Sequence, residues 1–133
     1  MPDYPLFGGC LCGAVRYRID AAPSVCCVCH CASCRRSAGA DSVGWLTAAA
    51  GDFALVRGEL SIHESSPGVG RGFCARCGSS LTYRNAADSV DGALASLDDP
   101  EALRPTEEVW LEERLSWNPA NPDLRPHRRG FGG

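Results

Sequence analysis

The sequence predicts a mostly β fold, in which small antiparallel sheets pack together as a single domain. Short apolar segments follow one another at roughly regular spacing, separated by turns rich in glycine and proline (15 Gly and 9 Pro in 133 residues). No segment has the apolar spacing of an α-helix of three turns or more. A chain of this length fits one domain. We therefore expect a single domain over 1–133, with its core at about 7–120 and an irregular tail at 121–133.

The strands are predicted from alternation and from short apolar runs. In 14–19, three apolar side chains alternate with Arg16 and Arg18, which is typical of a half-buried strand. One short helical turn is expected at 35–39, where Gly39 would end it. Further strands are expected at 42–48, 54–56, 60–62, 80–84, 90–97 and 107–111.

Two segments are predicted to be irregular. The stretch 65–72 is rich in Ser, Gly and Pro and predicts a loop. Prolines at positions 119, 122 and 126 argue against regular structure after Asn118. The glycine-rich end at 130–133 is expected to fray.

Composition excludes several functional classes. The net charge is −3 and all 13 basic residues are arginine, so the chain lacks the basic excess of a nucleic-acid binder and has no lysine for Schiff-base chemistry. The N-terminus does not resemble a signal peptide, and no apolar run approaches the roughly 20 residues that span a membrane. We expect a cytoplasmic protein whose nine cysteines stay reduced. The odd count also rules out complete disulfide pairing within one chain.

Four cysteines form one predicted zinc site with two zinc-binding knuckles. Cys74 and Cys77 have the C-x-x-C spacing of a knuckle, and Gly78 permits the backbone turn that follows the second ligand. Cys10 and Cys12 are two residues apart, so both sulfurs point the same way from an extended segment. The four thiolates together suit a structural zinc ion. The alternative is a redox dithiol at Cys74 and Cys77, although no βαβ pattern surrounds them.

Three further cysteines form a second predicted cluster. Cys29 and Cys31 would share one side of an extended segment, and the turn after Cys31 would bring Cys34 back toward them. Three protein ligands with an open fourth position are typical of a catalytic zinc. A substrate thiol could take that position, and coordination to the zinc would then deprotonate it.

The residues around this second cluster leave alternatives open. Arg35 and Arg36 directly follow Cys34 and could hold an anionic substrate group. Cys26, Cys27 or His30 could be a fourth ligand, which would make the site closed, and the site could also hold no stable metal. Cys26 and Cys27 are otherwise expected to be small core residues, and His30 is expected to point away from its neighbours.

The three tryptophans are also weighed as cleft or packing residues. Trp45 is expected to pack in the core or at its rim. Trp110 and Trp117 are as consistent with a ligand cleft as with packing.

Three segments carry a resemblance to a known family: GGCLCGAVRY at 8–17, CHCASCR at 29–35 and FCARCGSSL at 73–81. Their order and spacing resemble the glutathione-dependent formaldehyde-activating enzyme family, which includes a domain of centromere protein V. The resemblance extends over roughly 7–120. Glu108 stands where many members carry a histidine before the hydrophobic-Trp pair.

The resemblance implies a mostly β zinc fold with two zinc ions per chain. One would be structural, held by Cys10, Cys12, Cys74 and Cys77; the other would be catalytic, held by Cys29, Cys31 and Cys34. It implies that formaldehyde condenses with glutathione to S-hydroxymethylglutathione, which is a carbon–sulfur lyase reaction in reverse. The zinc, or a nearby donor such as His30 or an arginine, would steady the developing alkoxide. A non-catalytic zinc-scaffolded binding module and a thiol or metal sensor are the alternative functions.

Overall fold

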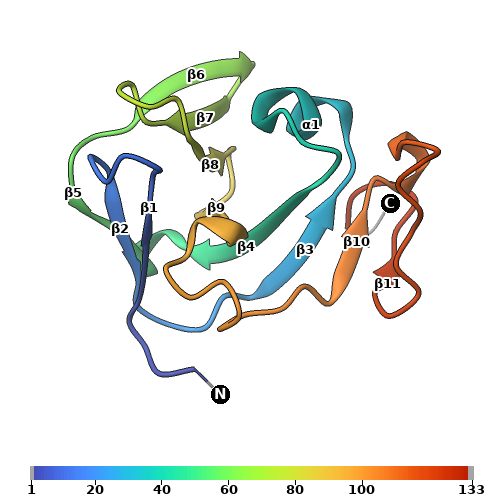
Figure 1. Ribbon diagram of the computed structural model, residues 1–133, viewed down its shortest axis with the longest axis horizontal. Helices are drawn as coiled ribbons and strands as arrows, with labels where there is room; N and C mark the ends of the chain where they lie inside the picture. Colours follow the sequence, from blue (N-terminus) through green and yellow to red (C-terminus); the bar gives the residue numbers. More distant parts are fainter. Residues whose placement is uncertain (1, 132–133) are drawn as a thin grey trace.

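The computed structural model describes residues 2–131 and contains two sheets and one α-helix (Figure 1). The smaller sheet has three antiparallel strands in the order β1-β2-β5: β1 (Leu6–Gly9), β2 (Arg16–Ile19) and β5 (Phe53–Arg57). The expectation of a mostly β fold is confirmed. No helix among the described residues is long and apolar enough to cross a membrane.

The larger sheet has eight strands in the order β11-β10-β3-β4-β9-β8-β7-β6. Its pairs are antiparallel except that β10 runs parallel to both β3 and β11. It bends into an arc from β6 to β10, and the helix α1 lies at the open side of that arc (Figure 1). The strands are β3 (Val25–Cys29), β4 (Val43–Ala49), β6 (Ser61–Ser66), β7 (Val69–Phe73), β8 (Ser80–Arg84), β9 (Ser89–Ala93), β10 (Glu107–Val109) and β11 (Arg125–Pro126). Three 3-10 turns complete the chain: η1 (Ala50–Asp52), η2 (Leu94–Ser96) and η3 (Leu111–Glu113).

The helix α1 (Ala32–Ala38) begins at a cysteine cap and ends at a glycine. Cys31 is extended, and its sulfur accepts a hydrogen bond from the backbone N–H of Cys34, in the manner of an N-cap residue. Gly39 adopts φ 63°, in the left-handed region, and its N–H bonds the carbonyl of Arg35. The predicted turn at 35–39 is thus the C-terminal part of a helix that starts at Ala32, because Cys31 supplies the cap.

The main core lies where the smaller sheet packs against the larger one. Tyr17, Ile19 and Leu46 are fully buried there, and the ring of Tyr17 stacks on Phe53 with centroids 5.3 Å apart. Gly8 has no room for a side chain, because a Cβ atom would collide with the Tyr17 ring. This close approach fixes β1 beside β2 in the smaller sheet and so positions the cysteines that follow β1.

The prediction of a loop at 65–72 is wrong, because most of this stretch belongs to the hairpin of β6 and β7. Ser66 pairs with Val69, so only Pro67 and Gly68 form the turn, with Gly68 at φ 76°. The strand β6 is largely exposed, so its residues do not alternate between apolar and polar side chains. Sequence periodicity therefore gave no strand signal there.

The tail predicted to be irregular at 121–133 contains the short strand β11 and is fastened to the domain. Pro126 is tolerated because β11 is an edge strand. The N–H groups of Trp110 and Glu112 bond the carbonyls of Arg129 and Arg128 at 2.9 and 3.1 Å. Of the end expected to fray at 130–133, positions 132 and 133 lie outside the described residues.

Candidate metal centres and cleft

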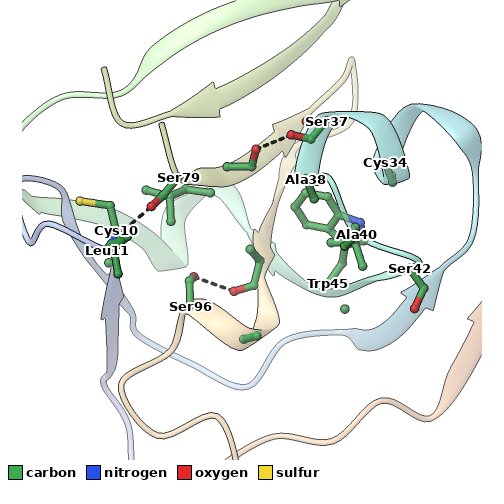
Figure 2. Close-up of a pocket in the computed structure, with 17 residues that line it drawn as sticks. Cys10, Leu11, Cys34, Ser37, Ala38, Ala40, Ser42, Trp45, Ser79 and Ser96 are labelled. Carbon is green, nitrogen blue, oxygen red and sulfur yellow. Dashed lines mark hydrogen bonds between the residues drawn. The ribbon is translucent and has the colours of Figure 1, made fainter. Parts of the chain in front are cut away.

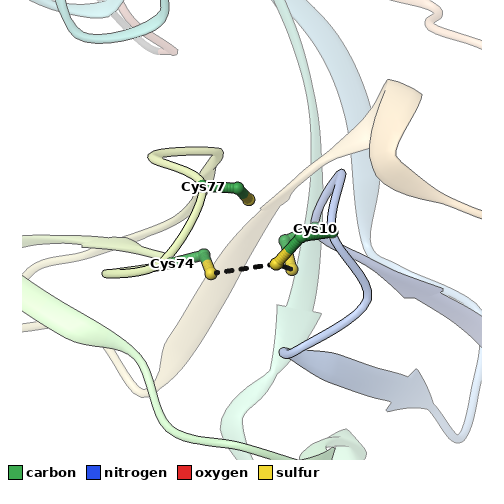
Figure 3. Close-up of side chains that lie close together, drawn as sticks. Cys10, Cys74 and Cys77 are labelled. Atoms are coloured by element: carbon green, nitrogen blue, oxygen red, sulfur yellow. Dashed lines mark hydrogen bonds between the residues drawn. The ribbon is translucent and has the colours of Figure 1, made fainter.

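The first candidate metal centre brings four cysteine sulfurs together. Cys10 and Cys12 lie in the connection between β1 and β2, and Cys74 and Cys77 follow β7; their Sγ atoms all lie within 4.8 Å of one another. The Cys10–Cys12 and Cys12–Cys74 sulfur distances are 3.7 and 3.8 Å. A tetrahedral zinc with Zn–S bonds of about 2.3 Å has sulfur–sulfur edges of about 3.8 Å. Figure 3 shows the sulfurs of Cys10, Cys74 and Cys77 turned toward a common point, so this cluster could hold a metal ion.

Backbone and hydroxyl groups around the first centre favour thiolates. The N–H of Val15 donates to Cys10 Sγ at 3.2 Å, and the N–H of Gly78 closes the knuckle on the carbonyl of Cys74 at 2.8 Å. The hydroxyl of Ser79 lies 3.2 Å from Cys77 Sγ, and this hydrogen bond is the main cause that lowers the pKa of Cys77 to about 5. Four clustered sulfurs with such donors suit a closed zinc site better than an isolated dithiol.

The second candidate centre brings three sulfurs together at the start of α1. Cys29 is the last residue of β3, Cys31 is the helix cap, and Cys34 lies in the first turn; their Sγ atoms lie within 4.8 Å of one another. Cys26 and Cys27 are both buried but belong to neither sulfur group: Cys26 packs in the main core, and Cys27 packs against the second cluster. Among the described residues, the three sulfurs have no fourth ligand of the metal-binding types beside them.

The three thiols compete for one negative charge. Hydrogen bonds from Cys29 and Cys31, with a further contribution from Arg71, lower the pKa of Cys34 to about 2. The pKa of Cys29 is raised, first by its hydrogen bonds to Cys31 and Cys34 and then by burial. Three thiolates this close repel one another unless a cation lies between them. The donor set therefore fits a soft divalent ion such as zinc.

A cleft of about 510 Å³ opens on the second cluster, and all three cysteines line it. Aromatic side chains from three strands or their ends form much of its wall: Trp45, Tyr83 and Trp110. Trp45 is therefore both a packing residue and a cleft residue, at 7% exposure. Trp117, which is 69% exposed, does not line this cleft. A small ligand in the cleft would have access to the sulfurs.

One row of side chains crosses four strands along the cleft. Arg71 on β7 pairs with Tyr83 on β8, Tyr83 pairs with Asp91 on β9, and Asp91 pairs with Thr47 on β4. All four line the cleft, because directly opposed residues share one face of a sheet. The hydroxyl of Thr47 donates to Asp91 Oδ1 at 2.7 Å, whereas burial raises the pKa of Asp91.

Arg71 is the functional candidate that the sequence reasoning missed. Its Nη1 and Nη2 atoms lie 3.7 and 3.8 Å from Cys34 Sγ, and its guanidinium lies over the Tyr83 ring at 5.0 Å from the centroid. The residue falls in the stretch that was predicted to be a loop. The only sequence signal is an arginine between two glycines shortly before Cys74.

Arg35 and His30, the predicted substrate contacts, do not line the cleft. Arg35 uses its guanidinium to bond the carbonyls of His30 and Glu113, at 3.1 and 3.4 Å. His30 is buried and points to Glu108, with 2.7 Å between Nε2 and Oε2. Both side chains therefore support the segment that carries the cysteines.

A further hollow of about 450 Å³ lies between the two sulfur clusters, since Cys10 and Cys34 both line it (Figure 2). Two hydrogen bonds seen in the figure brace its walls: the Ser80 hydroxyl donates to the carbonyl of Ser37 at 2.9 Å, and the N–H of Leu11 donates to the Ser79 hydroxyl at 3.0 Å. Trp45 separates this hollow from the cleft, because it lines both.

Comparison with known proteins places these clusters in a family. The family model described as glutathione-dependent formaldehyde-activating enzyme matches residues 5–113, which include all seven clustered cysteines. The chain belongs to this family. A protein of Halomonas elongata named "Putative glutathione-dependent formaldehyde-activating enzyme" is 33% identical over 140 residues, covering 96% of this chain and 87% of that protein. The resemblance found in the sequence is therefore confirmed.

The fold is also found in a crystal structure of a Rhodobacter sphaeroides protein. It superposes with a TM-score of 0.62 at 21% sequence identity, over 92% of this chain and 99% of that one. The likeness concerns the fold alone.

Proposed function

We propose that the protein is a zinc-dependent carbon–sulfur lyase of the S-(hydroxymethyl)glutathione synthase type, which adds a thiol to formaldehyde or a related small carbonyl compound. One observation carries the proposal: three cysteine sulfurs gather at the end of a cleft, with the guanidinium of Arg71 beside one of them. The family supports glutathione as the small-molecule thiol. The nine free cysteines support a cytoplasmic setting, where thiols stay reduced.

The two sulfur clusters would have different roles. Cys10, Cys12, Cys74 and Cys77 would hold a structural zinc, because four ligands fill a tetrahedral site. Cys29, Cys31 and Cys34 would hold the second zinc and leave a position facing the cleft. When bound there, zinc would supply the Lewis acidity that keeps the substrate thiol ionised at neutral pH.

The reaction needs no oxidant or reductant. An electron pair of the substrate sulfur forms the new bond to the carbonyl carbon, the π electrons of the carbonyl move to its oxygen, and that oxygen takes up the proton that the thiol lost. Arg71 would donate hydrogen bonds to the developing negative oxygen from its place beside Cys34. Asp91, in the same row and with a pKa that burial raises, would pass that proton on: its carboxyl group would protonate the oxygen and then recover the proton that the thiol released. His30 is not needed for either step.

The walls of the cleft would favour this addition by lowering the polarity around the reacting atoms. Trp45, Tyr83 and Trp110 line the same cleft as the three sulfurs. Such walls lower the local polarity and strengthen the hydrogen bonds from Arg71.

The proposal is tested by metal content and turnover on the same samples. Zinc per chain would be measured by elemental mass spectrometry for the natural protein and for Cys31→Ala, and the rate of adduct formation from glutathione and ¹³C-formaldehyde by NMR exchange. We expect about two zinc ions and accelerated exchange, falling to about one ion and the uncatalysed rate in Cys31→Ala. Two zinc ions without acceleration by any thiol and small carbonyl compound tested would contradict the enzyme and favour a binding module or sensor.

A further inference from the structure

A second hollow adjoins the cleft and has a different chemical character. It is a groove of about 410 Å³ between α1 and the β6–β7 hairpin. Arg71, Ser33 and Ser65 line both the groove and the cleft, so the two spaces share a wall. A ligand that reaches the sulfur cluster through the cleft can therefore extend into the groove.

The groove collects basic and hydroxyl side chains from two elements. On the hairpin, His63 is directly opposite Arg71, and Ser65 lies two residues along on the same face. On the helix, Ser33, Arg36 and Ser37 are spaced three and four residues apart, which places them on one side. Three basic residues and several hydroxyls thus face one another.

No carboxylate lines the groove, although the whole chain has a net charge of −3. Within 2–131, Arg36, His63 and Arg71 take part in no ion pair, so no acidic side chain there neutralises the basic groups of the groove. Two basic residues opposite each other in a sheet, as His63 and Arg71 are, gain nothing from being neighbours. The arrangement is explained if an anion lies between them.

Arg71 also has an unused donor at this junction. Its Nε is buried and has no hydrogen-bond partner in the described part of the chain. A buried donor without a partner costs free energy, so it points to an acceptor supplied by a ligand.

We propose that this groove binds a carboxylate of the thiol substrate, and that the enzyme therefore selects thiols that carry a carboxylate over neutral thiols. The inference rests on the proposed function, since it assigns the other end of the same substrate. The sulfur would lie at Cys29, Cys31 and Cys34, Arg71 would lie at the junction, and Arg36 and His63 would hold the carboxylate. Arginine suits this role because its planar donor pair matches the two carboxylate oxygens.

The first test compares substrates and variants in turnover. The natural protein, Arg36→Gln and Arg104→Gln would each be assayed with glutathione and with glutathione diethyl ester, which keeps the thiol but has no free carboxylate. Arg104 is a matched control because it is exposed and lines neither the groove nor the cleft. We expect the ester to have a KM about tenfold above that of glutathione, and Arg36→Gln to raise the KM for glutathione by a similar factor. Equal KM values for the two thiols, or for Arg36→Gln and Arg104→Gln, would overturn the inference while turnover itself upheld the proposed function.

The second test measures binding without chemistry. S-methylglutathione keeps both carboxylates but has no thiol, and its Kd would be measured by calorimetry with the same three proteins and with His63→Gln. We expect Arg36→Gln, and likewise His63→Gln, to weaken binding several-fold and more strongly at low salt. Binding that depends on Arg36 in a protein that turns over no thiol would uphold the groove and reject the proposed function. If inorganic phosphate binds in an Arg36-dependent way while S-methylglutathione does not, the groove serves another anion and the inference is wrong.

Discussion

His30 Nε2 lies 2.7 Å from Glu108 Oε2, and the two side chains are only 1% and 4% exposed. The other carboxylate oxygen of Glu108 accepts the N–H of Asn121 at 2.8 Å, and the Glu108 carbonyl accepts the N–H of His127 at 2.8 Å. Glu108 thus joins the end of β3, the strand β10 and the C-terminal tail. Because His30 lies between Cys29 and Cys31, the pair also fixes the backbone that carries the second sulfur cluster.

Replacing Glu108 should therefore cost stability in proportion to the hydrogen bonds that are lost. We expect Glu108→Ala to lower the free energy of unfolding by about 3 kcal/mol, because it leaves the buried ring donor of His30 and the partly buried N–H of Asn121 without acceptors. Glu108→Gln keeps an acceptor oxygen and should cost about 1 kcal/mol. Urea unfolding at neutral pH measures both, with the exposed Glu101→Gln as the control. Equal, small losses in all three variants would show that the pair does not hold the tail.

Replacing Arg71 should lower the rate of the reaction without changing the metal content. We expect Arg71→Gln to lower kcat by about 10²-fold, because a positioned donor to a developing oxyanion is worth that much. Zinc per chain should stay as in the natural protein, since Arg71 is not a ligand. Arg84→Gln, on the neighbouring strand and exposed, is the matched control. A parallel loss of zinc and activity in Arg71→Gln would mean that Arg71 only supports the cluster.

Substitutions in the two sulfur clusters should differ in their effects on stability and on activity. Cys74→Ala and Cys31→Ala should each lose about one zinc ion, but only Cys74→Ala should unfold at a much lower temperature, because its cluster ties β1–β2 to the end of β7 across the core. Cys31→Ala should keep its melting temperature within a few degrees and lose turnover. Thermal unfolding followed by circular dichroism makes the comparison. A large drop in the melting temperature of Cys31→Ala, matching that of Cys74→Ala, would mean that both clusters are structural.

The sequence predicted the sulfur clusters better than it predicted the cleft. Cys29, Cys31 and Cys34 are close in the chain, so local geometry is enough to bring their sulfurs together. The meeting of Cys10 and Cys12 with Cys74 and Cys77 is long-range, but C-x-x-C and C-x-C spacing specifies it because few other uses exist for such pairs in a reduced chain.

The cleft depends on strand register, which periodicity did not show. Arg71 lies on β7 opposite Tyr83 on β8 and within reach of Cys34, and β7 is a partly buried strand in which glycines interrupt the apolar residues. Arg35 was the natural guess because it is next to Cys34 in the chain, yet the helix turns its side chain onto the carbonyls of His30 and Glu113. Contacts between cysteines close in the chain could be predicted from the sequence, whereas contacts between strands depend on the register of the sheet.

Replacing Asp91 should have opposite effects on stability and on turnover. Burial raises its pKa in the folded protein, so the folded state keeps a proton that the unfolded state releases above about pH 4. Stability contributed by this site is therefore constant at low pH, falls as the pH rises through the window between the unfolded and folded pKa values, and is constant again above it. Asp91→Asn removes the titration and still accepts the hydrogen bond of Thr47 through its amide oxygen. We expect Asp91→Asn to unfold like the natural protein at pH 3 and to be more stable than it at pH 7.

The same substitution should slow the reaction, because an amide cannot donate a proton as a carboxylic acid does. We expect Asp91→Asn to lower kcat by about 10²-fold with zinc content unchanged. Urea unfolding at pH 3 and pH 7, with the exposed Asp88→Asn as control, supplies the stability difference, and NMR exchange supplies the rate. A variant that is less stable at pH 7 would show that Asp91 is charged and favourably bonded in the fold, and an unchanged kcat would remove it from the reaction. A gain in stability together with a loss of rate would instead mark Asp91 as a carboxyl group kept buried at an energetic cost for its chemistry.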